Sequence, residues 1–317
     1  MDRLPSPIPP QSPIAANDPK ESGAHASLKQ PSQHRAVFKR LGRNLGWVLG
    51  GRGFQALVSL AYLALAARAM GPERFGVFTL VLAYGQAIAN LVQFQSSQAA
   101  IRYGAIHIES RQNDRLARLI GFTATVDVVT AVLGAGVAAL GVRIAAPLLG
   151  WTLAPRAIAQ LLASVLLLST GSTPTGVLRL FNRFDLLTGC GAAASIARLA
   201  GVIAAWSMHG GIAAFLTVWA ATTLLEQAAQ WVATLRVLPM RLQFGRLAMT
   251  AALSENPRLW RFMLQTNFSS SLTLFWSQLG VLAVGAVAGP ATAGAVRLAA
   301  KLTKAIAKPV QILSGVL

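Results

Sequence analysis

Apolar runs of about twenty residues, separated by short polar stretches, follow one another along the chain from residue 45 onward. A run of this length with few or no charges is what a helix needs to cross the hydrocarbon core of a bilayer. Lipid offers the backbone no hydrogen-bond partners, and the runs are too continuous for barrel strands, so each run predicts a helix. The pattern therefore predicts an all-α polytopic membrane protein. The eight predicted spans are Leu45–Ala67, Phe75–Val92, Leu119–Val142, Ile158–Leu178, Leu186–Met208, Ile212–Leu235, Phe262–Val287 and Ala291–Leu313.

The composition narrows the class of protein further. Hydrophobic residues make up 54% of the chain and charged residues only 12%, whereas about a quarter of the residues of a soluble domain are charged. Cys190 is the only cysteine, which excludes an internal disulfide framework and a cysteine-based metal site. The four histidines are scattered and show no ligand spacing. The sequence thus predicts neither a metal nor a cofactor.

The lysines and arginines that give the chain its net charge of +18 are distributed unevenly between the two sides of the predicted membrane. The tail and alternate connections place 18 lysines and arginines on the side of the N-terminus and four on the other side. Positive residues favour the cytoplasm, so we expect a cytoplasmic N-terminus and helices that alternate from there. Because topology explains the charge, no nucleic-acid partner is expected.

Four segments are expected from these patterns. Residues 1–40 are rich in Pro, Ser and Gln and lack an apolar core, which is typical of a disordered tail. Residues 41–236 contain the first six spans and form one complete lobe. Residues 237–261 carry arginines among Leu, Phe and Trp, and are predicted to lie on the cytoplasmic face as an amphipathic connector. Residues 262–317 begin a second lobe with the last two spans.

Two stretches resemble each other at an offset of 218 residues, AARAMGPERFGVFTL and VGAVAGPATAGAVRL. Gly71 corresponds to Gly289 and Gly76 to Gly294. In each copy a Gly-Pro pair ends one helix, and the proline falls in the first turn of the next, where its missing N–H costs little. Six spans lie between the two copies, so both have the same orientation. This predicts a parallel repeat with a central cavity between two lobes.

The last predicted span carries four positive charges and no acid: Arg297, Lys301, Lys304 and Lys308. At about 100° per residue they fall within about 60° of arc and extend over about 16 Å of the helix axis. Each such charge costs about 2.5–3.5 kcal/mol near the bilayer centre, so this face would be hard to insert against lipid. We expect it to line the cavity and to bind an anion, with phosphate as the first candidate. The alternative is a helix on the membrane surface that binds anionic lipid head groups.

The other predicted spans carry fewer charged residues than the last one. Arg52 and Arg198 are expected to add to the basic cavity. Asp127 and Glu226 are the acids within the spans, and an acid in a membrane is a candidate for a proton or cation site. The alternative for both is a structural ion pair or a position near the interface.

Three stretches carry a resemblance to a known family: RAMGPERFGVFTLV, GVLRLFNRFDLL and QTNFSSSLTLFWSQLGVLAVGAVAGPATAGAVRLAAKLTKAIAKPVQIL. From about Arg40 to its last residue the chain resembles the polysaccharide biosynthesis (oligosaccharide flippase) family of the multidrug/oligosaccharidyl-lipid/polysaccharide exporter superfamily. The resemblance implies a bacterial inner-membrane transporter without enzymatic activity. Such a transporter flips undecaprenyl-pyrophosphate-linked sugar repeat units by alternating access between two lobes.

The resemblance also implies partners and a length. The partners are the lipid-linked oligosaccharide, the bilayer, and the polymerase and export proteins of lipopolysaccharide or exopolysaccharide synthesis. Members continue into a complete second lobe, so the chain is expected to be C-terminally truncated, inactive as a fragment or dependent on a partner chain. Asn267 and Gln278 in the seventh span are then expected to contact sugar, and Gln93, Gln95 and Gln98 to face the same cavity.

Other functions are left open by the residues. A peptidoglycan-precursor flippase would use the same phosphate chemistry. A multidrug exporter of the same superfamily would be expected to have an acidic or aromatic cavity, whereas the expected cavity is basic. A membrane glycosyltransferase or polymerase needs carboxylates near an outer loop, where the predicted loops offer only Glu73.

Overall fold

The computed structural model describes residues 30–92, 94–148, 157 and 172–314, and the regular structure in these ranges is helical. Contacts divide the chain into two units, residues 1–45 and residues 46–317. Helix α1 begins at Gln30, earlier than the predicted end of the tail at residue 40, and the disorder of the tail stays a prediction. The earlier start is compatible with Pro31, because proline is tolerated in the first turn of a helix. The packing described below belongs to the second unit.

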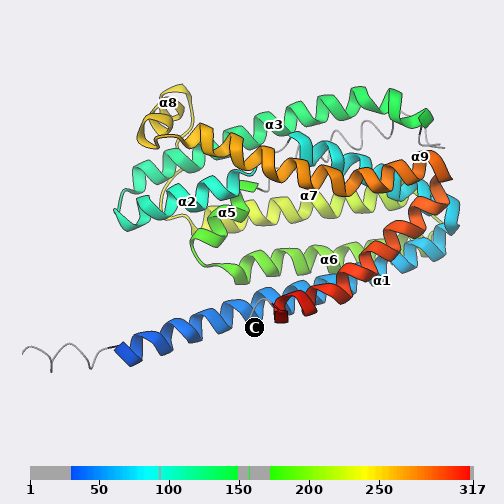
Figure 1. Ribbon diagram of the computed structural model, residues 1–317, viewed down its shortest axis with the longest axis horizontal. Helices are drawn as coiled ribbons and strands as arrows, with labels where there is room; N and C mark the ends of the chain where they lie inside the picture. The colour runs from blue at the N-terminus through cyan, green and yellow to red at the C-terminus, as the bar shows by residue number, and fades with distance from the viewer. Residues whose placement is uncertain (1–29, 93, 149–156, 158–171, 315–317) are drawn as a thin grey trace, which may run out of the picture. The chain divides into compact units, whose positions relative to one another are not determined.

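Helices α1 (Gln30–Val92) and α9 (Leu259–Ser314) are each broken at a glycine, as the repeat predicts. Gly71 has φ 75° and ψ 169°, and Gly289 has φ 83° and ψ 168°. Residues other than glycine rarely adopt these backbone angles, because their Cβ atom would clash with the backbone. Each helix therefore folds back at its Gly-Pro pair and forms two antiparallel segments, which confirms the helices predicted for both repeats (Figure 1).

The two copies of the repeat contact each other at equivalent positions. A Cβ atom on Gly76 would collide with the backbone of Pro290, and one on Gly294 would lie 3.2 Å from the Cα of Gly76. Three residues further along, Nη1 of Arg297 donates a hydrogen bond to the carbonyl oxygen of Thr79 (3.5 Å). Positions 76 and 294, like 79 and 297, are related by the offset of 218 residues. Equivalent residues that touch indicate an approximate two-fold axis between the two segments.

Helix α2 (Ser96–Glu109) was not predicted and stands where a loop was expected. Its buried face consists of small residues together with His107, and it packs closely on α5 (Ser172–Leu180). A Cβ atom on Gly176 of α5 would lie 2.7 Å from the Cα of Ser97. Close packing of small residues is a common way for helices to associate in membranes.

The remaining long helices agree with the prediction. They are α3 (Asn113–Leu148), α6 (Phe184–Ser207) and α7 (Ile212–Val237). Of the predicted span Ile158–Leu178, residues 158–171 lie outside the described residues, and α5 contains the rest. Aromatic and aliphatic side chains of α1, α3, α6 and α7 form the main core, with Phe215 fully buried in it.

Five helical stretches among the described residues are long and apolar enough to cross a membrane. They are Gly53–Val92, Asn113–Ala145, Phe184–Ser207, Ile212–Val237 and Gln278–Thr303. The first contains the break at Gly71 and so covers two of the predicted spans. The protein is a helical, multi-pass membrane protein, and the total of eight spans stays a prediction.

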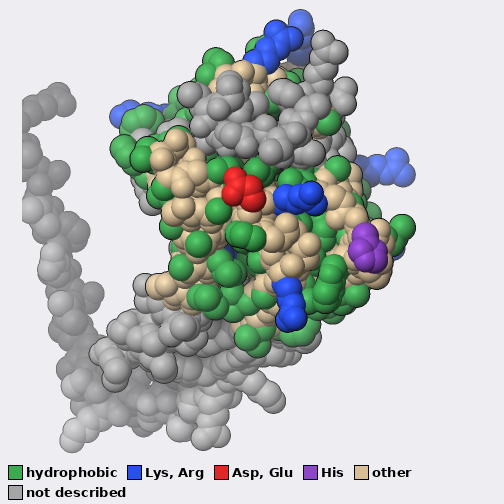
Figure 2. All heavy atoms as spheres, turned by 90° about the vertical axis from the view of Figure 1, so that its right-hand side faces the viewer, with side chains coloured by type: hydrophobic (Ala, Val, Ile, Leu, Met, Phe, Trp, Pro, Cys, Tyr) green, Lys and Arg blue, Asp and Glu red, His purple; other side chains and the backbone are tan. Residues whose placement is uncertain are grey.

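The two ends of the helical bundle differ in their charged residues. The Gly-Pro turns of α1 and α9 lie at one end, and hydrophobic and uncharged side chains prevail on that face (Figure 2). The opposite end carries the turn between α2 and α3, the turn between α5 and α6, and helix α8 (Arg246–Glu255) (Figure 1). Arg111, Arg183 and Arg246 of the predicted cytoplasmic connections belong to these three elements. The assignment of these ends to the two sides of the membrane, and with it the orientation of the N-terminus, stays a prediction.

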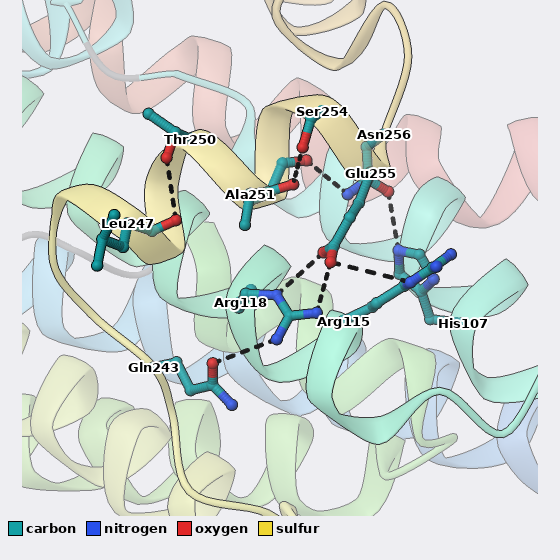
Figure 3. A network of polar contacts seen from close by, with 11 residues as sticks. His107, Arg115, Arg118, Gln243, Leu247, Thr250, Ala251, Ser254, Glu255 and Asn256 are labelled. Carbon is teal, nitrogen blue, oxygen red and sulfur yellow. Dashed lines mark hydrogen bonds and ion pairs between the residues drawn. The ribbon is translucent and has the colours of Figure 1, made fainter.

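Helix α8 is held to α2 and α3 by a network of polar contacts (Figure 3). Arg118 donates from Nε to Oε2 of Glu255 (3.1 Å) and from Nη2 to Oε1, and Nε of Arg115 lies 3.9 Å from the same Oε1. Nε2 of His107 and Oδ1 of Asn256 are 2.9 Å apart in a buried contact. The predicted connector is thus fixed to the first lobe by charge-assisted hydrogen bonds, which are stronger than neutral ones.

Candidate functional site

Arg297 lies on the second segment of α9, where the turn at Gly289 places it against the first repeat. In addition to its bond to Thr79, it donates from Nη2 to Oε1 of Gln86 (3.3 Å). The side chain is half-buried. Arg297 of the second repeat therefore bonds to Thr79 and Gln86, which follow the Gly-Pro turn of the first repeat.

Lys301, one turn further along α9, contacts the first segment of α1. Its Nζ donates a hydrogen bond to Oγ of Ser59 (2.9 Å). Tyr62 follows Ser59 by three residues on the same face of α1, and its side chain is buried. Lys301 is close enough to interact electrostatically with the Tyr62 phenol.

Arg198 reaches the same tyrosine from α6. Its Nε donates to Oγ1 of Thr222 (2.9 Å), and its Nη2 donates to Oγ1 of Thr223 (3.1 Å). The guanidinium carbon lies 5.8 Å from the centre of the Tyr62 ring, within the range of a cation–π interaction. Arg297 also interacts electrostatically with Tyr62. The structure thus brings Arg198, Arg297 and Lys301 together around Tyr62, and we call these three residues the basic cluster.

The basic cluster carries an excess of positive charge. In the part of the chain that the structure describes, neither Arg198 nor Arg297 forms an ion pair with a carboxylate. Glu226, one turn beyond Thr222 on α7, attracts Arg198 from a greater distance. Cations held among helices without close counter-charges favour an anion that enters from outside. The chemistry that fits is a phosphate or diphosphate, which takes bidentate bonds from Arg and a point charge from Lys.

Three predicted members of the site cannot be placed. The side chains of Arg52, Lys304 and Lys308 lie outside the described residues, although the backbone is helical at all three positions. Their contribution to the basic cavity stays a prediction.

The two predicted coupling acids lie in different surroundings. Oδ2 of Asp127 accepts a hydrogen bond from the backbone N–H of Thr173 (2.7 Å), in the first turn of α5. A carboxylate at a helix N-terminus stabilises the helix through the free N–H groups and the helix dipole. Glu226 is half-buried and lines a pocket beside α5 and α6. The geometry gives Asp127 a capping contact, and a coupling role for either acid stays a prediction.

The two predicted sugar contacts lie on the first segment of α9. Asn267 and Gln278 are both half-buried. Eleven residues separate them, so they share one face of the helix about 16 Å apart. Their role in sugar binding stays a prediction.

Two adjoining pockets open between α2, α5, α6 and α7, with volumes of about 330 Å³ and about 440 Å³. They share Thr175, Arg179 and Gln230 in their walls, and we call them together the amide pocket. The side-chain amides that line it are those of Gln55, Asn90, Gln95, Gln98, Gln227 and Gln230. Gln95 and Gln98 thus line a pocket within the first lobe, and their expected position in the cavity between the lobes stays a prediction; Gln93 lies outside the described residues.

Sequence reasoning missed most of the amide pocket. One signal was present on α7, where Thr222, Glu226 and Gln230 follow one another at intervals of four residues. This spacing puts polar side chains on one face of an otherwise apolar helix. Thr175, in contrast, lies in the predicted span Ile158–Leu178 and Arg179 directly follows it, but the length of an apolar run does not show that both line a pocket.

Comparison with known proteins agrees with this architecture. A family model described as "Polysaccharide biosynthesis protein" matches residues 41–317. A protein of Escherichia coli (strain K12) named "Inner membrane protein YghQ" is 28% identical over 285 residues, which cover 87% of this chain and 79% of the relative. No solved structure matches the chain significantly.

Proposed function

Because the chain belongs to the polysaccharide biosynthesis protein family, we propose that it carries undecaprenyl-pyrophosphate-linked oligosaccharides across the bacterial inner membrane. The family's members are generally transporters rather than enzymes, and the similar protein from Escherichia coli is named an inner membrane protein. Both support a transport role in that membrane. The polymerase and export proteins that use such repeat units would be its partners.

The basic cluster is the observation that carries this proposal. Arg198, Arg297 and Lys301 come from α6 and α9 and interact with Tyr62, Arg198 through its ring and the other two electrostatically, between helices that are apolar enough to cross a membrane. Among the described residues, Arg198 and Arg297 have no carboxylate in an ion pair; a diphosphate would bring them a negative charge, and their cost in a membrane falls when it is bound. The polyprenyl chain of such a substrate is as apolar as lipid and needs no site of its own.

The repeat supports alternating access as the mechanism. The close contact of Gly76 with Pro290 joins the two segments at the end of the bundle that carries the Gly-Pro turns. Transporters built from repeats move one repeat against the other around a site at their interface. A diphosphate at Lys301 and Arg297 would lie at this interface, because both side chains bond to the first repeat.

The test is flipping of a fluorescent undecaprenyl-diphosphate oligosaccharide by the full chain in liposomes, with charge reversal at the basic cluster. Lys301→Glu and Arg297→Glu should each lower the rate by about tenfold or more, since a charge-assisted hydrogen bond contributes about 1.5–3 kcal/mol. Arg143→Glu makes the same change at an exposed position on α3 and should leave the rate unchanged. Equal rates for all three variants would contradict the proposed role of the cluster.

A further inference from the structure

The amide pocket and the basic cluster share one face of α7. Thr222 bonds to Arg198 of the basic cluster, while Glu226 and Gln230, one and two turns further along, line the amide pocket. Residues at this spacing lie above one another on a helix. A ligand in the amide pocket is therefore next to an anion held at Arg198.

Two amides of the pocket, those of Gln227 and Gln230, offer hydrogen bonds to a ligand. Within the described residues, Oε1 of Gln227 is buried and accepts no hydrogen bond. Oε1 of Gln230 accepts a bond from Oγ1 of Thr175 (3.2 Å), which leaves the N–H₂ group of Gln230 as a donor. A buried acceptor without a partner is unfavourable, so Gln227 favours a ligand that donates a hydrogen bond.

The charges of the pocket distinguish its ligand from a phosphate. Arg179 and Glu226 have opposite signs, and all other polar side chains that the structure places in its walls are uncharged. Amides and hydroxyls both donate and accept hydrogen bonds, as every sugar hydroxyl does. The volumes also lie within the range of small-molecule pockets, about 300–1,000 Å³. These properties fit a neutral sugar ring.

We infer that the amide pocket is the sugar subsite of this transporter. It holds a neutral sugar of the substrate while the adjoining basic cluster holds the diphosphate. The inference rests on the proposed function and deepens it, because it assigns the head group to α2, α5 and α7 of the first lobe. Gln227 and Gln230 are the residues that form hydrogen bonds with the sugar hydroxyls.

The test compares two water-soluble probes on the purified full chain in nanodiscs: farnesyl diphosphate, and farnesyl diphosphate linked to N-acetylglucosamine. Calorimetry measures both dissociation constants for the native chain and for Gln227→Met, Gln230→Met and Lys301→Ala. Methionine keeps the length of glutamine and removes its hydrogen bonds. Gln112→Met is the matched control, because Gln112 lies in the turn between α2 and α3, away from the pocket.

The native chain should bind the sugar-linked probe about tenfold more tightly than farnesyl diphosphate. Each pocket variant should lose this difference and keep its affinity for farnesyl diphosphate, which also shows that the variant is folded. Lys301→Ala should weaken both probes equally, and Gln112→Met should match the native chain.

Equal affinity of the native chain for the two probes, or a difference that survives in both pocket variants, would overturn the sugar subsite and leave the diphosphate site standing. If the native chain binds neither probe, the proposed function fails and the subsite fails with it.

Discussion

Replacing Gly76 with alanine tests the contact between the two repeats. The added Cβ would meet the backbone of Pro290 and lie 2.7 Å from the backbone nitrogen of Ala291. These atoms belong to the start of a helix and cannot rotate away as a flexible side chain would. The two segments must therefore move apart for the methyl group to fit.

The size of the effect follows from this distance. Ordinary contacts of a Cβ begin at 3.4 Å, so the nitrogen of Ala291 alone requires a movement of 0.7 Å (3.4 minus 2.7). Overpacking of this kind costs about 1–3 kcal/mol, whereas alanine in a helix gains up to about 1 kcal/mol over glycine. We expect Gly76→Ala to lower the free energy of unfolding by about 1–2 kcal/mol.

Two further glycines provide a graded comparison. A Cβ on Gly294 would lie 3.1 Å from the Phe75 ring and 3.2 Å from the Cα of Gly76, so a shift of a few tenths of an ångström suffices. Gly294→Ala should therefore be nearly neutral. Gly136 is exposed on α3 with no atom within 4 Å of an added Cβ. Gly136→Ala should raise stability by about 0.5–1 kcal/mol through helix propensity alone.

The assay is unfolding of the purified full chain in mixed micelles with increasing dodecyl sulfate, followed by circular dichroism and tryptophan fluorescence. The expected order of stability is Gly136→Ala, then the native chain with Gly294→Ala, then Gly76→Ala. If Gly76→Ala is as stable as Gly136→Ala, the two repeats do not meet at this glycine, and the two-fold axis inferred from their contact is wrong.

The remaining predictions concern single contacts. Asp127→Ala should lower stability by about 0.5–2 kcal/mol, because α5 loses its capping carboxylate, and the same unfolding assay measures it; an unchanged midpoint would contradict the cap. Arg118→Ala should release Glu255, and with it α8, from α3, so that trypsin cleaves after the exposed Arg246 several-fold faster. Arg183→Ala is its control, because the Arg183–Asp185 pair is exposed and such pairs contribute little. A topology reporter fused after Ser110 should lie in the cytoplasm and one fused after Met208 outside it; a cytoplasmic Met208 would reverse the expected orientation.

The features predicted correctly from sequence have long or repeated signals. Helices α3, α6 and α7 follow from apolar runs that exceed the thickness of a bilayer. The breaks at Gly71 and Gly289 follow from two similar stretches that each contain Gly-Pro. In both cases the physical cause, burial in lipid or a backbone angle that requires glycine, acts on residues close together in sequence.

The features that were missed depend on packing between distant residues. Helix α2 presents Ser97, Ala100 and Gly104 to its neighbours, and small residues leave little trace in a hydropathy pattern. The amide pocket joins residues from Gln55 to Gln230, whose helices only the tertiary fold brings together. Arg198 could be suspected from sequence, but its position beside Tyr62 could not.

The repeat also explains why only its second copy contributes a positive charge, Arg297, at the contact between the two copies. Equivalent residues meet near a two-fold axis, so two arginines at positions 79 and 297 would face each other and repel, strongly in a medium of low polarity. Position 79 is instead Thr79, whose carbonyl oxygen accepts a hydrogen bond from Arg297. One repeat supplies the positive charge at the axis and the other supplies the acceptors that hold it. The two sequences differ at the axis, so Arg297 lies there without a like charge opposite it.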